Sequence, residues 1–168
     1  MHIVRPERPE DVPGIRHVNE SAFETPTEAA LVDALRQQAQ PTISLVALSG
    51  DVIVGHIMFS PVVVSSPPDM HVLGLAPMAV LPMWQRQGIG SSLVQAGLEA
   101  CRRRGAVAVV VLGHPEYYPR FGFTPASQFG LTSEYDVPDE VFMAIELTPG
   151  ALRATTGTVR YHPAFASV

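Results

Sequence analysis

The sequence contains no lysine, a single cysteine and few charged residues. All 11 basic residues are arginine, which excludes Schiff-base chemistry on lysine and the phosphate-binding Walker motif, since both need a lysine. Cys101 alone can form neither an internal disulfide nor a multi-cysteine metal site. The 6 histidines show no metal-ligand spacing, so we predict that the protein uses no metal.

Long apolar runs and a basic surface are also missing. No run reaches the ~18–20 residues of a membrane span, and the N-terminus lacks the order of a signal peptide. The net charge of −5 argues against nucleic-acid binding. Because 46% of the residues are hydrophobic and 16% are charged, disorder is excluded. We expect one cytoplasmic domain over residues 1–168, with neither nucleic acid nor a membrane as a partner.

A strand–helix–strand unit occupies the middle of the chain. Residues 88–104 carry apolar side chains on one helical face and end in three arginines before Gly105. A long strand at 70–80 precedes this helix, and an uninterrupted apolar strand at 106–112 follows it. The two strands are therefore predicted to be parallel, with a right-handed crossover.

The other segments are predicted to add helices and strands around this unit. Asp11 has the pattern of an N-cap before the first helix, and Thr25-Pro26-Thr27-Glu28 has the capping-box pattern before the second. Residues 125–140 are expected to form a loop. The remaining strands are expected at 2–4, 43–48, 52–59, 141–147 and 158–162.

The segment Gln85–Ser91 has the composition of a phosphate loop. It leads from a strand into a helix, where unpaired backbone N–H groups attract anions and glycines allow close approach. A Rossmann dinucleotide site would need a third glycine where Leu93 stands, and an acidic residue about 20 positions further on. The strand at 106–112 contains no acid. The Rossmann interpretation therefore fails.

Two motifs resemble those of the GNAT superfamily of acetyl-CoA-dependent N-acetyltransferases. Gln85, Gly88 and Gly90 match the family's pyrophosphate pattern Gln/Arg-x-x-Gly-x-Gly/Ala. The segment from Tyr118 to Phe123 matches its Tyr-x-x-x-Gly-Phe motif at the expected distance. The resemblance covers about residues 2–147, and the detailed residue sequence is most similar to that of the YhbS-like branch.

The resemblance implies a mixed α/β fold. Its central twisted sheet is mostly antiparallel, one parallel strand pair is splayed to admit acetyl-CoA, and helices cover both faces. The pantetheine arm would lie along the strand at 70–80, and the pyrophosphate on the amides that follow it. The cofactor-binding residues implied in this way are Met78, Ala79, Val80, Gln85, Arg86, Gln87, Gly88, Ile89, Gly90 and Ser91.

The resemblance also makes Tyr118 the general acid that protonates the departing thiolate. It supplies no base, because no carboxylate stands between Met70 and Val80. Glu24, in the connection between the first two helices, is the best substitute. Glu28 is interpreted as a capping acid, and His71 and His114 are weaker candidates.

Two further side chains are interpreted as structural. Cys101 lies on the apolar helix face and is expected to be an inert buried thiol, so we expect direct attack by the amine in a ternary complex. Tyr117 is out of register with the motif and is expected in the core or the cavity wall.

The sequence thus predicts acetyl transfer from acetyl-CoA to an amine, on either a small molecule or a protein. The alternative is a non-catalytic acyl-CoA sensor of the same fold. A monomer and a homodimer both stay open. The extension at 148–168 is expected either to close the acceptor pocket or to pair with another subunit.

Overall fold

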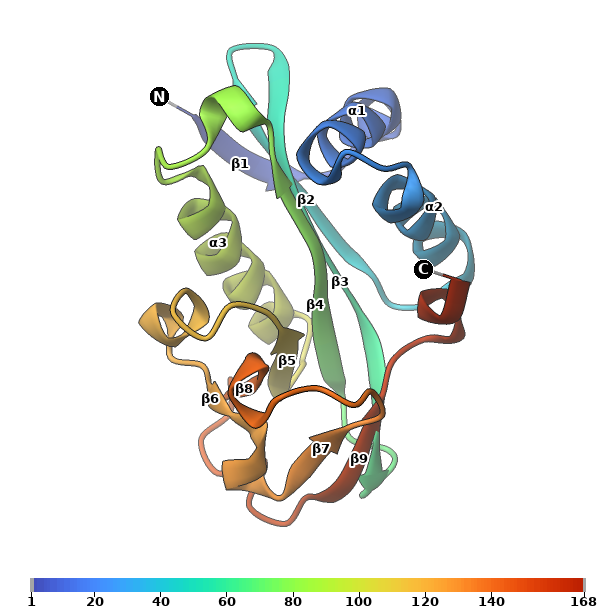
Figure 1. Ribbon diagram of the computed structural model, residues 1–168, viewed down its shortest axis with the longest axis vertical. Coiled ribbons are helices and arrows are strands. Elements are labelled where there is room, and N and C mark those ends of the chain that lie inside the picture. Colours follow the sequence, from blue (N-terminus) through green and yellow to red (C-terminus); the bar gives the residue numbers. More distant parts are fainter. Residues whose placement is uncertain (1, 168) are drawn as a thin grey trace.

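The computed structural model describes residues 2–167 of the chain (Figure 1). Within these residues, three helices and nine strands are joined by short loops and 3₁₀ turns. The helices are α1 (Val12–Phe23), α2 (Thr27–Gln38) and α3 (Ile89–Arg103). The strands are β1 (Ile3–Pro6), β2 (Ile43–Ser49), β3 (Val52–Ser66), β4 (Val72–Val80), β5 (Ala108–Leu112), β6 (Thr124–Pro125), β7 (Leu131–Ser133), β8 (Phe142–Glu146) and β9 (Thr156–Arg160).

The strands form one sheet that is mostly antiparallel. Its main path runs β1-β2-β3-β4-β5-β8-β6, and only β4 and β5 are parallel along it. The α3 crossover joins these two strands, as the strand–helix–strand pattern predicted. β9 pairs with the far half of β3 and, in parallel, with β7. The predicted mixed α/β fold is confirmed, and β7 with β9 adds a second short parallel pair.

Helices cover both faces of this sheet. The apolar side of α3 buries Ile89, Leu93 and Cys101 against β2, β3 and β4. On the opposite face, α1 and α2 bury Ile15 and Leu35 in a separate cluster. Figure 1 shows α3 on one side of β3 and β4, and α1 and α2 on the other. Both layers are thus fixed by ordinary amphipathic patterning.

The parallel pair separates before β4 ends. Pairing joins Val72 through Leu75 to Ala108 through Val111. β4 then continues to Val80, while β5 ends at Leu112. The edge of β4 beyond Leu75 is therefore open toward β5. This is the splayed pair that the family resemblance implied.

Three local predictions need correction. The capping box predicted at Thr25–Glu28 does not form, because the N-cap of α2 is Pro26 and the helix has no side-chain cap hydrogen bond. Asp11 stands at the N-cap position of α1, but its carboxylate makes no cap hydrogen bond. It accepts one from the Arg8 N–H at 2.7 Å and two from the Arg5 guanidinium at 2.7 and 3.0 Å. The predicted loop at 125–140 contains β7, whose three residues are too few to show strand periodicity.

The segment after residue 147 belongs to the same sheet through β9. Leu152, Val159 and Tyr161 are buried in a cluster with β3, β5 and β8 side chains. Within residues 2–167, no helix has the length and apolar character needed to cross a membrane.

Candidate active site

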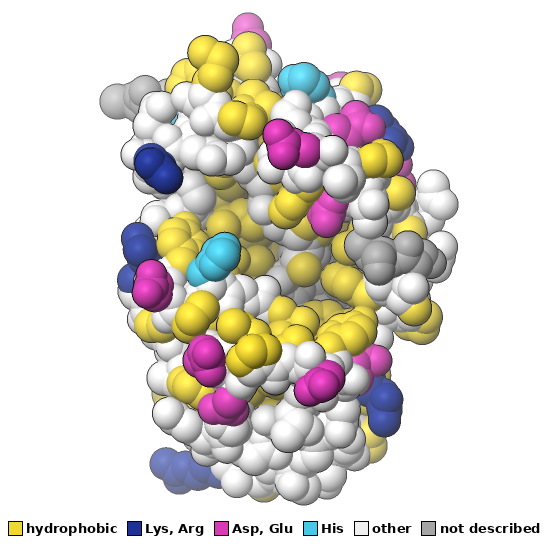
Figure 2. Space-filling view, in the orientation of Figure 1, with side chains coloured by type: hydrophobic (Ala, Val, Ile, Leu, Met, Phe, Trp, Pro, Cys, Tyr) yellow, Lys and Arg dark blue, Asp and Glu magenta, His cyan; other side chains and the backbone are white. Residues whose placement is uncertain are grey.

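A cavity of about 960 Å³ opens where β4 and β5 separate. Figure 2 shows this face of the molecule hollowed, with hydrophobic side chains inside the hollow. The cavity is lined by the β4 edge, the start of α3, the residues after β5 and parts of α1 and α2. The lining residues are Phe23, Glu28, Leu31, Leu75, Ala76, Pro77, Met78, Val80, Trp84, Gln85, Arg86, Gly88, Gly90, Ser91, Leu112, Gly113, His114, Tyr117, Tyr118 and Arg120.

One end of the cavity is the N-terminus of α3. Gly88 is its N-cap and has φ +86°, a left-handed conformation that disfavours other residues. No atom lies within 4 Å of the place where a Cβ on Gly88 would stand. The start of a helix leaves backbone N–H groups without an intrahelical partner and carries the positive end of the helix dipole. Such a terminus is suited to bind an anion.

Side-chain hydrogen bonds hold the loop before this helix. The Gln85 amide donates to the Val80 carbonyl at 3.0 Å, which ties the loop to the end of β4. The Gln87 amide donates to the Met83 carbonyl at 3.1 Å. The first glutamine of the predicted pyrophosphate pattern thus shapes the loop.

Seven of the ten predicted cofactor-binding residues line the cavity. The other three are Ala79, Gln87 and Ile89, which are absent from the lining. Ala79 and Ile89 have buried side chains, and Gln87 is exposed. The seven that line the cavity are Met78, Val80, Gln85, Arg86, Gly88, Gly90 and Ser91.

Tyr118 forms part of the cavity wall at the 3₁₀ turn Tyr118–Phe121. Its ring packs edge-on against Phe123, with centroids 5.6 Å apart. A Cβ on Gly113 would stand 2.3 Å from the Tyr118 ring, so the close approach requires glycine there. Burial, and then the neighbouring Tyr117, raise the pKa of Tyr118 to about 12. The phenol is therefore protonated at neutral pH and can donate its proton.

Tyr117 lies at the phosphate end of the cavity. Its hydroxyl is 2.9 Å from the place where a Cβ on Gly90 would stand. The Arg120 guanidinium lies over the Tyr117 ring, 4.6 Å from its centroid, and its Nε donates to the Tyr117 carbonyl at 2.9 Å. Tyr117 was predicted in the core or cavity wall, and it lines the cavity. Arg120 was not predicted as a site residue, although it lies inside the Tyr-x-x-x-Gly-Phe motif.

The candidate proton acceptors occupy different places. His114 and Glu28 line the cavity. Glu24, predicted as the base, is exposed in a left-handed conformation with φ +59° just after α1, and it is absent from the lining. His71 precedes β4, and its Nδ1 is 4.0 Å from the place of a Cβ on Gly105, beyond the far end of α3.

Cys101 is completely buried on α3. Burial raises the pKa of its thiol to about 12, so the thiolate needed for nucleophilic attack is scarce at neutral pH. Among residues 2–167, no group of three or more His, Cys, Asp or Glu side chains could hold a metal ion.

The sequence matches the Acetyltransferase (GNAT) family over residues 12–123, which is more than half of the chain. The chain belongs to the GNAT family. This confirms the relationship that the glycine loop and the Tyr118 motif indicated, and it makes the protein a GNAT acetyltransferase.

Curated GNAT relatives extend the similarity to nearly the whole chain. The N-acetyltransferase YhbS of Escherichia coli K12 is 37% identical over 164 residues, which cover 97% of this chain and 98% of YhbS. The N-acetyltransferase YjhQ of the same strain is 40% identical over 136 residues, covering 77% of this chain and 74% of YjhQ.

Two solved GNAT structures are similar in fold. Escherichia coli YhbS in complex with CoA has a TM-score of 0.92 at 36% identity and covers 98% of this chain and 92% of its own. A GNAT acetyltransferase from Brucella melitensis in complex with acetyl-CoA has a TM-score of 0.81 at 36% identity, with 98% of each chain covered.

Proposed function

We propose that this GNAT protein moves the acetyl group of acetyl-CoA to an amine by direct attack within a ternary complex. The observation that carries the proposal is one cavity that joins the glycine-bearing start of α3, the open edge of β4 and the phenol of Tyr118. The CoA and acetyl-CoA complexes of the two similar structures support the choice of co-substrate. The named N-acetyltransferase relatives favour catalysis over a non-catalytic sensor.

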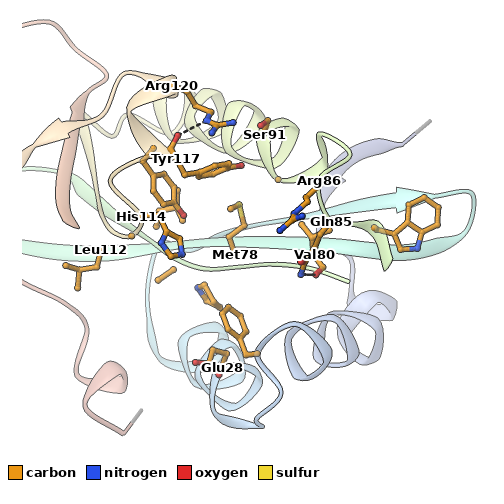
Figure 3. A pocket seen from close by; sticks show the side chains of 18 of the residues that line it. Glu28, Met78, Val80, Gln85, Arg86, Ser91, Leu112, His114, Tyr117 and Arg120 are labelled. Carbon is orange, nitrogen blue, oxygen red and sulfur yellow. Dashed lines mark hydrogen bonds between the residues drawn. The ribbon is translucent and has the colours of Figure 1, made fainter. Parts of the chain in front are cut away.

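The α3 end of the cavity would hold the diphosphate of acetyl-CoA. Backbone N–H groups from Arg86 to Ser91 would donate to the phosphate oxygens, with the Arg86 guanidinium beside them (Figure 3). The Tyr117 hydroxyl, which lies beside Gly90, and Arg120 would add donors. The pantetheine arm would then follow the open β4 edge past Met78 and Val80, including the backbone of Ala79.

Acetyl transfer would proceed in one attack at the thioester carbon. The C–N bond forms and the C–S bond breaks, while a backbone N–H near Val80 donates to the carbonyl oxygen as its charge grows, a role often worth ~3 kcal/mol. Tyr118 would give its proton to the departing sulfur. We assign the proton that leaves the amine to His114, since it lines the cavity and directly follows β5 and Gly113. Glu24 stays the alternative base.

The test is a reaction of the purified protein with acetyl-CoA and a panel of amines. We expect free thiol to appear together with acetylated amine of matching mass. Calorimetry with CoA establishes binding separately. Binding of CoA without any transfer across small amines and lysine peptides would favour the sensor instead.

We further propose that residues 1–168 act as one cytoplasmic domain. β9 supports this organisation, because it builds the segment after residue 147 into the same sheet. The buried free thiol of Cys101 suits a reducing compartment. Either a monomer or a homodimer is compatible with this organisation.

A further inference from the structure

The cavity has opposite charges at its two ends. Arg86 and Arg120 line it near the start of α3, whereas Glu28 is the only carboxylate among its described lining residues. Figure 3 shows Glu28 on the α2 side of the cavity, across from Arg86, Tyr117 and Arg120. Figure 2 shows further acidic side chains above and below the hollow on this face. The end that the diphosphate does not need is therefore negative.

The Glu28 carboxylate is held in place but its charge is not neutralised by the chain. The Thr25 hydroxyl donates to Oε1 of Glu28 at 2.9 Å, which restrains the side chain at the start of α2. None of the ion pairs among residues 2–167 includes Glu28. Nearby arginines bind other acids: Arg16 pairs with Asp33, and Arg36 pairs with Asp33 and Glu7.

Apolar side chains flank this carboxylate. Phe23 and Leu31 line the same part of the cavity, and Phe23 is 37% exposed although it is a large hydrophobic residue. An occupant that covers them needs an apolar segment, and one that satisfies Glu28 needs a positive charge. A flexible amine with a second cationic group has both properties.

The reacting nitrogen cannot be the charge that Glu28 binds. Attack on the thioester requires a lone pair, so that nitrogen is neutral when the C–N bond forms. A cation that stays paired with Glu28 during the reaction must therefore be a different group of the acceptor.

We propose that the acceptor carries a second cationic group, separated from the reacting amine by an apolar segment, and that Glu28 binds this group. This inference rests on the proposed function and specifies its substrate class. Glu28 acts here as a specificity-determining residue. A charge-assisted hydrogen bond in a half-buried site is expected to favour such an acceptor about tenfold.

The experiment uses three amines with six carbons each that differ only at the carbon farthest from the reacting amine. Hexylamine ends in a methyl group, diaminohexane ends in a second ammonium, and aminohexanoate ends in a carboxylate. The full chain is compared with Glu28→Gln, Glu28→Arg and the control Glu20→Gln. Glu20 is exposed on α1 and absent from the cavity lining, so its variant removes the same charge from the same region.

We expect kcat/KM to be about tenfold higher for diaminohexane than for hexylamine, after correction for its two equivalent amines. Glu28→Gln should abolish this preference and leave hexylamine within about twofold, while Glu20→Gln keeps it. Glu28→Arg should favour aminohexanoate. An undiminished preference in Glu28→Gln would overturn the proposal. An equal loss of kcat/KM with all three amines in Glu28→Gln would also overturn it, because that result would indicate that Glu28 acts as the base.

A binding readout separates this inference from the proposed function. Calorimetry of diaminohexane against each protein saturated with CoA should give about tenfold weaker affinity for Glu28→Gln than for the unmodified chain. This difference is expected even if no acetyl transfer occurs. Equal affinities would refute the role of Glu28, whereas failure to bind CoA would refute the proposed function alone.

Discussion

The two glycines at the start of α3 should respond in opposite ways to the same added methyl group. Gly88 has φ +86° with open space around its missing Cβ, so Gly88→Ala introduces backbone strain without a steric clash. This strain is about 1–2 kcal/mol. For a chain of this size it lowers Tm by about 2–8 °C.

Gly90 lies inside α3 and has no left-handed conformation. Its added Cβ would stand 2.9 Å from the Tyr117 hydroxyl and 3.7 Å from the Met78 methyl group. Both atoms are at the far ends of side chains that can shift. Alanine also favours the helix over glycine by up to ~1 kcal/mol. Gly90→Ala should therefore keep or raise Tm, and CoA affinity should stay within about threefold.

Gly88→Ala should also weaken CoA binding. If the backbone relaxes its strain, the N–H groups turn away from the phosphate. The loss of one charge-assisted hydrogen bond lowers the affinity for CoA about tenfold. At CoA about 100 times the Kd of the unmodified chain, bound ligand adds about 2.7 kcal/mol. That raises Tm by about 5–10 °C. The same CoA concentration should add only about 1.4 kcal/mol, or about 3–6 °C, in Gly88→Ala.

Scanning calorimetry with and without CoA measures both effects, and titration calorimetry gives the affinities. An unchanged Tm and an unchanged CoA-induced shift in Gly88→Ala would refute the reasoning about the anion cradle. A large loss of stability in Gly90→Ala would show that the Tyr117 side chain cannot move away from the added methyl group.

Three other results are expected. Tyr118→Phe should lower kcat about 100-fold with little change in CoA affinity, and the parent enzyme should show no alkaline fall from this phenol below about pH 10, since the pKa of Tyr118 is raised to about 12. Cys101, whose thiol pKa is raised to about 12, should resist alkylation in the folded protein, and activity should survive treatment with thiol reagents. Rapid inactivation would instead support a mechanism through a covalent acyl-enzyme. Burial lowers the pKa of His56 from 6.5 to about 4. The unfolded chain therefore binds more protons between these values, so stability should fall by about 3 kcal/mol as pH drops through that window. Denaturant titrations should show that the free energy of unfolding depends less on pH in His56→Gln than in the unmodified chain.

Residues close together in sequence made the α3 end of the cavity predictable. Gln85, Gly88 and Gly90 belong to one strand-to-helix turn, and all three line the cavity. The parallel β4–β5 pair followed from the intervening helix and the rules of handedness. Tyr118 could be found because its motif follows β5 at a fixed distance.

The acceptor end of the cavity was harder to predict from the sequence, because it depends on tertiary packing. Glu24 is the C-cap of α1 and Glu28 lies in the first turn of α2, and no local pattern tells which of them faces the cavity. The Thr25–Glu28 pattern indicated a capping box, but α2 has no side-chain cap hydrogen bond, and the Thr25 hydroxyl instead donates to the Glu28 carboxylate. The sequence could not show that the same carboxylate also lines the cavity, because the β4 edge that faces it lies about 50 residues away in the chain. β7 was missed for a similar reason, since its partner β9 is distant in sequence.

The position of β9 has a consequence for biosynthesis. Val63 and Val64 near the end of β3 pair with Arg160 and Val159, which follow them about 95 residues later in the chain. A nascent chain therefore carries the far half of β3 without its neighbour until β9 has also been synthesised. Shortened transcripts or premature termination should leave an unpaired apolar strand, and such products are expected to aggregate or be degraded.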